Sequence, residues 1–402
     1  MRANSVLEVA LYALLALPLI LVILDSSYRL LFLAVIHLPA RKGRHPSGAN
    51  EKLRLLILLV AHNEQRTIER TLSIIKTQTD GDGLSRVLVL ADHCSDDTAD
   101  IATGMGIGVC RRDEGLPGKA QALSWLASEA ADQMLASDVV VVLDADSLVQ
   151  DSFCQAIRDA FEPEIDAVQS FVNPISANGF PLTTLVSFSE ILAGKIDDAA
   201  RSRLGWSVPL RGTGMAFRTS TFIEACQHLG TQVDDIELSV RLAELGVRVR
   251  LQARAVVGDP KAERVLGLAR QRGRWLKGQR QVWRTKGRSI GRLLAAGPQN
   301  WSLIQAMLLK PKTAVMTMRL GLLAAFWAWP FPSSTIHDVL VVAVAASLLV
   351  DLLYYLVGLQ FVDEASRYLL SLLASPLLLV LWVISWAYSL LPTREWLRAQ
   401  KE

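Results

Sequence analysis

The feature that most constrains the fold is a short apolar run that ends in two carboxylates, VVVVLDADS at residues 139–147. Four valines and a leucine in succession are typical of a strand that is buried on both faces of a sheet. Asp144 and Asp146 stand two positions apart on an extended chain, so their side chains point the same way. Their oxygens suit Mg²⁺ or Mn²⁺, which substrate phosphates would share. The alternative is a solvated turn, because an Asp-x-Asp pair after a strand is a weak motif by itself.

Composition places the chain between a soluble enzyme and a membrane protein. Of its 402 residues, 51% are hydrophobic and 20% are charged, and the mean hydropathy is +0.30. The chain is too apolar for an ordinary soluble enzyme and too charged for a bundle of membrane helices alone. We expect a soluble domain of roughly 240 residues fused to membrane helices. The net charge of +3 gives no support to nucleic acid as a partner.

The four cysteines show no spacing typical of a metal site or of a disulfide framework. We interpret them as unpaired thiols in a reducing compartment. They are Cys94, Cys110, Cys154 and Cys226. The first apolar run lacks a convincing small-residue cleavage site, so no cleavable signal peptide is expected.

Apolar runs at both ends of the chain predict membrane helices. Residues 6–24 are long enough, at about 1.5 Å per residue, to cross a hydrocarbon core of about 30 Å. Residues 30–38 are too short to cross, so this run either extends the first helix or lies in the interface. Three more runs follow at residues 314–331, 339–361 and 368–391.

The basic residues that flank these runs conflict with a simple count of crossings. Arg41, Lys42 and Arg44 place the end of the first run in the cytoplasm. One crossing followed by three would leave the C-terminus outside, yet Arg394 and Arg398 favour the cytoplasm. Either the first run adds a re-entrant piece, or one of the late runs does not cross.

These patterns divide the chain into six segments. A linker with Gly, Pro, Ser and Asn separates the first anchor from the soluble domain. The stretch after that domain mixes basic and apolar residues, which is typical of helices along a membrane surface; a core helix of the soluble domain is the alternative. The segments are an anchor at 1–42, a linker at 43–52, the soluble domain at 53–286, interfacial helices at 287–312, three membrane helices at 313–392 and a polar tail at 393–402.

Within the soluble domain, apolar strands alternate with helical stretches, which predicts an α/β fold with a mostly parallel sheet and helices on both faces. The expected strands are residues 53–60, 86–91, 109–111, 139–143 and 167–172, and the expected helices are residues 64–77, 98–105, 118–135 and 151–161. Ligands of such sheets collect at the carboxyl ends of the strands. Acidic residues stand at three of these ends, and a metal or a polyhydroxylated ligand would offset their repulsion. For Glu64 and Asp92, helix capping is the alternative.

Short polar motifs follow one another from residue 55 to about residue 278, over half of the chain. They are AHNE at 61–64, ADHCSDDT at 91–98, GKAQAL at 118–123, DAD at 144–146, RGTGMAF at 211–217, VDDIEL at 233–238 and QRGRW at 271–275. In this order they resemble the motifs of family 2 glycosyltransferases, the membrane-integrated inverting enzymes that include cellulose, chitin and hyaluronan synthases and, more distantly, ceramide glucosyltransferase. Two positions depart from that pattern: His93 replaces a carboxylate of the nucleotide turn, and Asp234 replaces a glutamate.

The resemblance implies a GT-A Rossmann-like fold fused to N- and C-terminal transmembrane helices, and an inverting, metal-dependent enzyme that uses a UDP-sugar. It implies Mg²⁺ or Mn²⁺ as the cofactor, with Asp146 as its ligand. It assigns to the nucleotide sugar Ala61, Glu64, Asp92, Lys119, Asp144, Gln271 and Arg274. Arg274 offers a planar fork suited to phosphate oxygens, and Lys119 stands at a helix start that favours phosphate. A solvated side chain is the alternative for Lys119.

Asp235 is the predicted general base, because it opens a helical pattern and its carboxylate can take the proton of an acceptor hydroxyl. A helix N-cap is the alternative. The acceptor side is assigned to Gly212, Thr213, Gly214 and Trp275. The two glycines allow the backbone to approach the acceptor closely, and the indole would stack on the acceptor. Interfacial anchoring is the alternative for Trp275.

The main functional hypothesis is transfer of a sugar to a polysaccharide or lipid-linked acceptor in cell-envelope synthesis; a single-addition glycolipid synthase is the alternative. A nucleotidyltransferase should show a glycine-rich basic signature near the first strand, which AHNE lacks. A non-catalytic scaffold should have lost Asp146, Asp235 or Arg274, and all three remain. We expect an integral protein of the inner membrane with its catalytic domain in the cytoplasm. Membrane lipids and other envelope-biosynthesis proteins are its expected partners, and nucleic acid is not.

Overall fold

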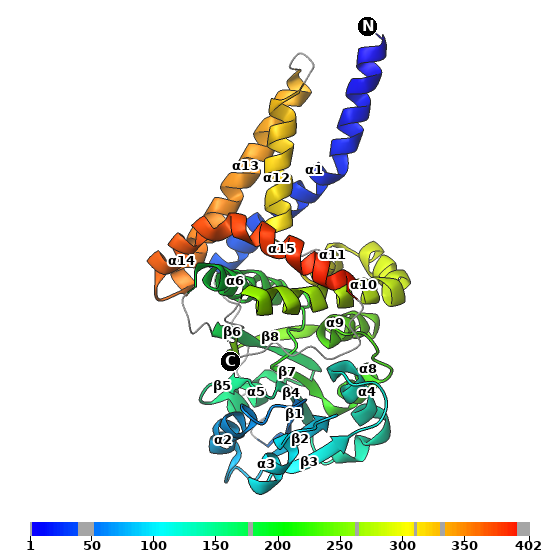
Figure 1. Ribbon diagram of the computed structural model, residues 1–402, viewed down its shortest axis with the longest axis vertical. Coiled ribbons are helices and arrows are strands. Elements are labelled where there is room, and N and C mark those ends of the chain that lie inside the picture. Colours follow the sequence, from blue (N-terminus) through cyan, green and yellow to red (C-terminus); the bar gives the residue numbers. More distant parts are fainter. Residues whose placement is uncertain are drawn as a thin grey trace.

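The chain folds into an α/β domain at one end and a group of long helices at the other (Figure 1). The computed structural model describes residues 2–38, 52–175, 180–261, 265–308, 312–329 and 334–391. The predicted linker at 43–52 lies mostly outside these residues, and the predicted tail at 393–402 lies wholly outside them. All four cysteines are free thiols, as expected.

One sheet of eight strands organises the α/β domain, in the order β3-β2-β1-β4-β7-β6-β8-β5. The strands are β1 (Leu55–Ala61), β2 (Ser85–Asp92), β3 (Gly108–Arg112), β4 (Val139–Asp144), β5 (Leu148–Val149), β6 (Ala167–Ile175), β7 (Met215–Arg218) and β8 (Val249–Pro260). The first four in this order pair in parallel, β7 is antiparallel to both of its neighbours, and β8 is parallel to β6 and antiparallel to β5. The carboxyl ends of β1, β2 and β4 therefore meet at one edge.

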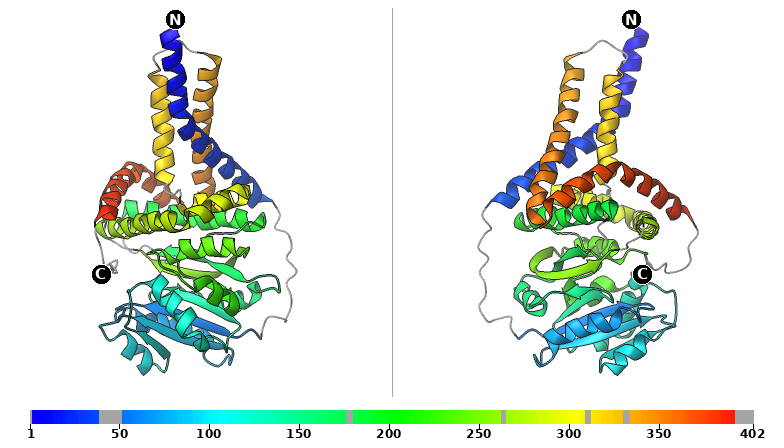
Figure 2. Two further views of the ribbon diagram at one scale, coloured as in Figure 1. Left: turned by 90° about the vertical axis from the view of Figure 1, so that its right-hand side faces the viewer. Right: turned by 60° about the vertical axis from the view of Figure 1, so that its left-hand side comes forward.

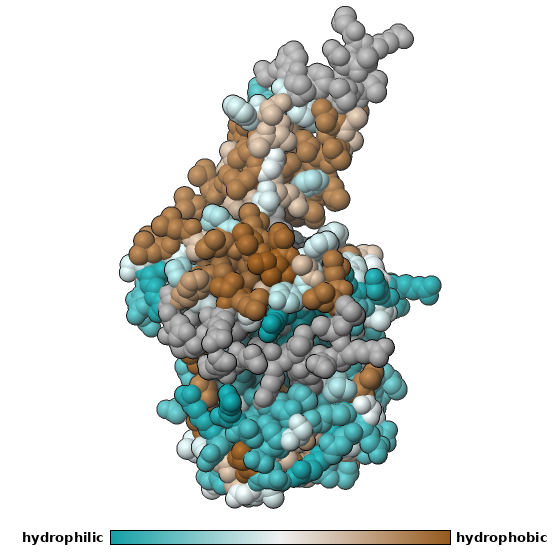
Figure 3. Space-filling model, in the orientation of Figure 1, coloured by the Kyte–Doolittle hydropathy of each residue, from teal (hydrophilic) through white to brown (hydrophobic). Residues whose placement is uncertain are grey.

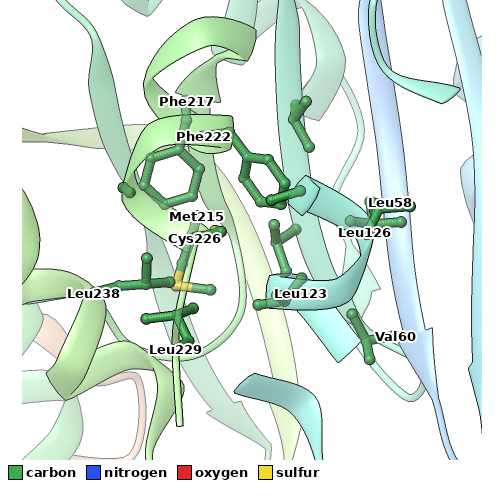
Figure 4. Packing of buried hydrophobic residues seen from close by; sticks show 14 of the residues in the cluster. Leu58, Val60, Leu123, Leu126, Met215, Phe217, Phe222, Cys226, Leu229 and Leu238 are labelled. Carbon is green, nitrogen blue, oxygen red and sulfur yellow. The ribbon is translucent and has the colours of Figure 1, made fainter. Parts of the chain in front are cut away.

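Both faces of the sheet are covered by helices, because alternate side chains of each buried strand enter different cores. Leu58 and Val60 of β1 pack with Leu123 and Leu126 of α4 (Lys119–Glu129), as Figure 4 shows. The intervening residues of β1 pack on the other face against α2 (Ile68–Thr79) and α5 (Phe153–Ala160). The predicted α/β class with two covered faces is confirmed.

The remaining helices are α3 (Thr98–Gly104), α6 (Pro181–Leu192), a π-helix (Ala193–Asp198), α7 (Ala199–Arg203), α8 (Thr219–Cys226), α9 (Asp234–Glu244), α10 (Val265–Ala295), α11 (Pro298–Leu308) and α12 to α15. Helices α6, α10 and α11 form a layer between the sheet and the long helices (Figure 2). Helix α10 runs without a break through Lys286, where the sequence predicted the end of the soluble domain. Gly287 costs a helix about 1 kcal/mol, and Val282 and Ile290 on either side of it are buried against α9 and α11.

Three helices run together away from the α/β domain: α1 (Arg2–His37), α12 (Lys312–Trp327) and α13 (Thr335–Gly358) (Figures 1 and 2). Helices α14 (Ala365–Ser371) and α15 (Ser375–Leu390) instead lie across the base of this bundle, with α15 along α10. Three helical stretches are long and apolar enough to cross a membrane: Val9–His37, Thr335–Phe361 and Ala365–Leu390. In α12 the apolar part, Val315–Trp327, is shorter.

A closed ring of four charges ties the three helices of the bundle together. Asp25 lies 2.9 Å from Arg29 on the next turn of α1 and 2.7 Å from Arg319 of α12. Asp351 of α13 completes the ring, 2.6 Å from Arg29 and also paired with Arg319. These pairs explain why α1 is one helix, although the sequence suggested two runs separated by charged residues. The charges of Asp25 and Arg29, which interrupt the apolar sequence, are neutralised by their partners inside the bundle.

Candidate active site

Lys119 is the centre of the polar site at the carboxyl ends of the strands. Its Nζ lies 2.6 Å from Asp144 Oδ1 and 3.6 Å from Asp234 Oδ2, and it donates to the carbonyl oxygen of Gly212. Burial alone would lower the pKa of Lys119, but Asp144 and Asp234 outweigh it and hold that pKa above its usual value. The structure thus brings together four segments that the sequence analysis singled out: the starts of α4 and α9, the end of β4 and the glycine-rich turn.

The glycine-rich turn is fixed in place by its neighbours in the sheet. Thr213 is buried; its hydroxyl lies 2.7 Å from the Ser147 hydroxyl and accepts the N–H of Asp144 at 3.2 Å. At Gly214 φ is +65°, and a Cβ would lie 2.8 Å from the Cβ of Ser170 on β6. A close approach to β6 therefore explains this glycine, without any need for an acceptor. The turn locks the Asp144–Asp146 segment to β7.

Two adjacent carboxyl groups open α9 beside this turn. Burial raises the pKa of Asp235, and the neighbouring Asp234 raises it further, to about 7. Its Oδ1 accepts the N–H of Ile236 at 2.8 Å, and Lys119 and Arg211 oppose the rise more weakly. Burial also raises the pKa of Asp234. A carboxyl group with a pKa near neutrality matches what a general base needs at physiological pH.

The carboxylates after β4 fit a divalent ion that is shared with a substrate. Asp144 has a side chain that is 42% exposed, and one of its oxygens is already ion-paired with Lys119. Asp146 is partly buried at the following turn. Among the described residues, no group of three His, Cys, Asp or Glu side chains could cage an ion. The pair therefore suits an ion that takes its other ligands from phosphate and water, as Mg²⁺ commonly does.

The nucleotide turn is more internal than the sequence suggested. Asp92 is fully buried; one oxygen contacts Arg112 and lies 3.0 Å from His93 Nδ1, and the other accepts the N–H of Gly118 at 2.8 Å. In this arrangement Asp92 holds the start of α4 and so positions Lys119. Contact with a nucleotide would require one of these partners to move.

The AHNE segment is tied to the nucleotide turn. Ala61 is fully buried at the end of β1. The N–H of Glu64 donates to the Thr98 hydroxyl at 2.6 Å, and Glu64 Oε2 accepts from the Thr67 hydroxyl at 2.8 Å. Glu64 therefore holds the Thr67 side chain at the start of α2, with no side-chain bond to a helix N–H among these contacts, and its nucleotide-sugar role stays a prediction.

The QRGRW motif lies on α10, where Gly273 faces α15 and Arg274 lies near the acid pair Asp234–Asp235. Gly273 touches α15, where a Cβ would lie 2.9 Å from the carbonyl oxygen of Ser385. Arg274 is close enough to the acid pair that its charge opposes the burial-driven rise of the Asp234 pKa. Within the described residues, Arg274 Nε and Asp234 Oδ2 are buried without a hydrogen-bond partner. Gln271 is partly buried and Trp275 is 37% exposed, and neither is placed against the acid pair by a described contact.

Two buried residues that the sequence analysis missed support the glycine-rich turn. Asp198 of the π-helix pairs with Arg211, and its other oxygen lies 2.9 Å from Arg201. Gln169 of β6 accepts the N–H of Arg211 and donates to the carbonyl oxygen of Thr213, both at 2.9 Å. Arg112 supports Asp92 in the same way. No motif in the sequence signals these pairings, because all of them except Asp198–Arg201 join different elements of the fold.

Comparison with known proteins fixes the family. The model described as "Glycosyltransferase like family 2" matches residues 54–278, more than half of the chain and the same span that carries the motifs. The chain belongs to this family. No curated protein matches it.

Several solved structures resemble this family member. The mannosyltransferase PcManGT from Pyrobaculum calidifontis, solved with GDP-Man and Mn²⁺, is 18% identical, with a TM-score of 0.55; the match covers 90% of this chain and 99% of that one. Glucosyl-3-phosphoglycerate synthase from Mycobacterium tuberculosis is 25% identical over 52% of this chain and 69% of its own, with a TM-score of 0.35. S. aureus TarS is 10% identical over 84% of this chain and 89% of its own, with a TM-score of 0.41. The first likeness establishes the GT-A fold. The predicted kinship with cellulose, chitin and hyaluronan synthases stays a prediction.

Proposed function

We propose that this family 2 glycosyltransferase is membrane-integrated and transfers a sugar, with inversion, from a UDP-sugar to a lipid-linked or polysaccharide acceptor of the cell envelope. The observation that carries the proposal is the buried pair Asp234–Asp235, which meets Lys119 and Asp144 beside the glycine-rich turn. A base, a cation and paired carboxylates are the groups that sugar transfer from a diphosphate requires. They lie at the starts of α4 and α9 and at the end of β4, and α9 packs against α10 and α11 of the layer that separates the α/β domain from the apolar helices (Figure 2).

On the donor side, Arg274 would clamp the diphosphate with its buried, unpartnered Nε, and Gln271 would assist it. Lys119 holds Asp144 in place, and Asp144 would contact ribose or sugar hydroxyls. Asp146 would hold Mg²⁺ or Mn²⁺, which supplies Lewis-acid neutralisation of the leaving diphosphate. PcManGT was solved with Mn²⁺ and a nucleotide sugar, which supports this class of donor.

On the acceptor side, Asp235 would take the proton from the acceptor hydroxyl. The hydroxyl oxygen then bonds to the anomeric carbon as the bond from that carbon to the diphosphate oxygen breaks. A single displacement of this kind inverts the anomeric centre. Gly212 would line the acceptor path, supported from behind by the buried Thr213 and Gly214, and Trp275 would stack on the acceptor at the end nearest the membrane.

The interior of the helix bundle supports a lipid acceptor over a polymer that is moved through the bundle. Arg319 and Tyr354 are fully buried there, and the ring of four charges occupies the space between α1, α12 and α13. A polymer path between these helices would require the ring to open. A lipid-linked acceptor can instead approach along the membrane surface.

The same arrangement supports a membrane placement in which α1, α12 and α13 cross the bilayer while α14 and α15 lie at its surface. Three crossings leave the C-terminus on the side of the catalytic domain. The conflict posed by Arg394 and Arg398 then disappears, because the last apolar run does not cross. Basic residues after α1 place that side in the cytoplasm.

Donor hydrolysis by the detergent-purified full chain tests the proposal without knowledge of the acceptor. The panel is UDP-glucose, UDP-galactose, UDP-N-acetylglucosamine and GDP-mannose, each with Mg²⁺, Mn²⁺ or EDTA. We expect a UDP-sugar to be hydrolysed fastest and only with a metal. The matched control is Asp146→Asn, which removes the proposed metal ligand with little change in shape. Hydrolysis of GDP-mannose alone would overturn the UDP assignment, and failure to bind or hydrolyse any of the four would contradict the proposed activity.

Product length then separates the two acceptor hypotheses. With membrane extract as the source of acceptor and the best donor in labelled form, we expect one discrete glycolipid. A ladder or a long polymer on a gel would show processive extension instead.

A further inference from the structure

We propose that the C-terminal half of α10, with the start of α11, binds the anionic headgroups of the bilayer in which the apolar helices sit. The binding surface, called here the basic patch, consists of Arg284, Arg288, Arg292, Trp283 and Trp301. The inference rests on the membrane placement proposed above. It concerns a part of the chain that takes no part in the proposed chemistry.

The charge of this region is one-sided. Helix α10 contains nine basic residues and no acidic residue: Arg270, Arg272, Arg274, Lys277, Arg280, Arg284, Lys286, Arg288 and Arg292. In the sequence, no Asp or Glu occurs between Val265 and His337. A segment of this composition attracts anions.

The basic residues in the two halves of α10 have different partners. In the first half, Arg272 stacks over the Trp382 ring and Arg280 donates to the carbonyl oxygen of Ser389, both on α15. In the second half, Arg284 and Arg288 are exposed, and no carboxylate of the described residues pairs with either. Arg292 is 79% exposed; its Nη2 donates to the Ser289 hydroxyl at 3.3 Å and lies 3.9 Å from Glu244. The charge of the second half is therefore largely uncompensated.

The basic patch also carries the aromatic residues that favour a membrane interface. Trp283 and Trp301 are both exposed, although indoles are usually buried when they serve only packing. Tryptophan prefers the headgroup level, where its ring is apolar and its N–H can reach water. Arginines beside tryptophans on one helix are typical of helices that lie in the interface plane.

The position of α10 and α11 matches the headgroup level. The Tyr28 hydroxyl of α1 donates to the carbonyl oxygen of Pro298 at 2.8 Å, and the Gln305 amide donates to Asp25 at 3.1 Å. These bonds fix α11 beside the end of the bundle that meets the α/β domain. In Figures 1 and 3 this is the level at which the hydrophobic surface gives way to the hydrophilic surface. A bilayer that surrounds the bundle would present its phosphates there.

Spin-label electron paramagnetic resonance in vesicles measures the proposed selectivity directly. The full chain is reconstituted in phosphatidylcholine, and its association with spin-labelled phosphatidylglycerol is compared with that of spin-labelled phosphatidylcholine. One arginine near an anionic surface is worth about fivefold, so we expect the wild type to prefer the anionic label at least about fivefold. The triple variant Arg284→Gln/Arg288→Gln/Arg292→Gln should show nearly equal association. High salt should also remove the preference, because it shortens the screening length to a few ångströms.

A matched control removes the same charge from the far end of the molecule. Arg66, Arg70 and Arg111 are exposed in the α/β domain, and Arg66→Gln/Arg70→Gln/Arg111→Gln should keep the wild-type preference. Equal association of both labels with the wild type, or an unchanged preference in the first variant, would overturn the inference. A chain that does not float with neutral vesicles would contradict the membrane placement itself. Donor hydrolysis in detergent reports separately on the chemistry.

Discussion

The pKa of Asp235 allows two independent tests of the proposed base, one on the pH dependence of activity and one on the pH dependence of stability. Burial and the neighbouring Asp234 raise the pKa of Asp235 to about 7. If Asp235 accepts the acceptor proton, only its ionised form is active. The value of kcat/KM should therefore rise about tenfold per pH unit below pH 7 and level off above it, since this ratio reports the groups of the free enzyme. Asp235→Asn should lose transfer at every pH and keep donor binding.

The same pKa predicts how the substitution changes stability. The ordinary value of an aspartate is 3.8, so the folded state holds its proton about three pH units longer than the unfolded chain does. Stability is then greatest below about pH 4, falls as pH rises through this window and reaches its lower level above pH 7. At about 1.4 kcal/mol per unit, ionisation of Asp235 costs up to about 4 kcal/mol. Asp235→Asn avoids that cost, so it should stabilise the protein at pH 8 and have little effect near pH 4.

Thermal unfolding of the ligand-free protein in detergent, at pH 5 and pH 8, measures this difference. The variant should unfold at a higher temperature than the wild type at pH 8, and the gap should narrow at pH 5. Asp113→Asn, at an exposed loop position, is the control and should show no such dependence. A gap that is equal at both pH values, together with wild-type transfer by Asp235→Asn, would refute the assignment and make Asp234 or Glu237 the next candidate.

Three further predictions concern other parts of the molecule. EDTA should abolish transfer, and Asp146→Asn should reduce it at least ~10²-fold, whereas near-normal turnover without metal would remove the metal from the mechanism. Calorimetry should show that Arg274→Ala weakens UDP binding by roughly 1.5–3 kcal/mol, while Trp275→Ala keeps UDP affinity within about threefold and raises the acceptor KM; equal losses would mean that the segment acts as one unit. In the bundle, Arg319→Met should lower the unfolding temperature, because an unpaired buried charge costs about 3–5 kcal/mol. The charge-balanced Arg319→Met/Asp351→Leu should recover most of that loss, and a double variant as unstable as the single one would show that the ring has no such role.

The parallel half of the sheet could be predicted because its strands are continuous apolar runs. The five predicted strands correspond to β1, β2, β3, β4 and β6, with ends displaced by at most three residues. The strands that were missed owe their existence to partners. Strand β5 has two residues, β7 has four and follows the glycine-rich turn, and β8 carries Arg250, Gln252 and Arg254 among its apolar residues and pairs with β6 across a bulge. The hydrophobic pattern of a single segment does not indicate which other strand it will pair with.

The membrane helices show the same limit. Asp25 and Arg29 divide the first apolar region in the sequence, so the sequence alone left two alternatives, that residues 30–38 extend the first helix or that they lie in the interface. In the fold these two residues are partners of Arg319 and Asp351, nearly three hundred positions or more away. Because the charges of Asp25 and Arg29 are neutralised by residues of other helices, α1 can continue through them inside the bundle. The sequence of α1 alone does not contain this information.

The sequence predicted the polar site residues that stand at or near the ends of strands. It did not predict the residues that hold these side chains in place from other elements of the fold. Lys119, Asp144, Asp234 and Gly212 meet as motif order and sheet topology imply. Asp92 shows what was missed: its partner Arg112 belongs to β3 and gives this carboxylate an internal supporting role that the motif does not signal, while its nucleotide contact stays a prediction. Such roles depend on which side chain fills the space beside a carboxylate, and the sequence motif does not specify it.

The π-helix connects the bundle of α1, α12 and α13 to the glycine-rich turn through two consecutive residues. Asp197 accepts the hydroxyl of Tyr354 on α13 at 2.9 Å, and Asp198 pairs with Arg211, which directly precedes Gly212. Neighbouring residues of a helix face different directions, so Asp197 and Asp198 contact the bundle and the glycine-rich turn respectively. A π-turn inside a longer helix is a costly arrangement that commonly occurs at functional sites. Because the Arg29 guanidinium also stacks on the Tyr354 ring, the ring of four charges and the glycine-rich turn share one set of contacts. The helix bundle and the glycine-rich turn are therefore linked through direct side-chain contacts of the π-helix.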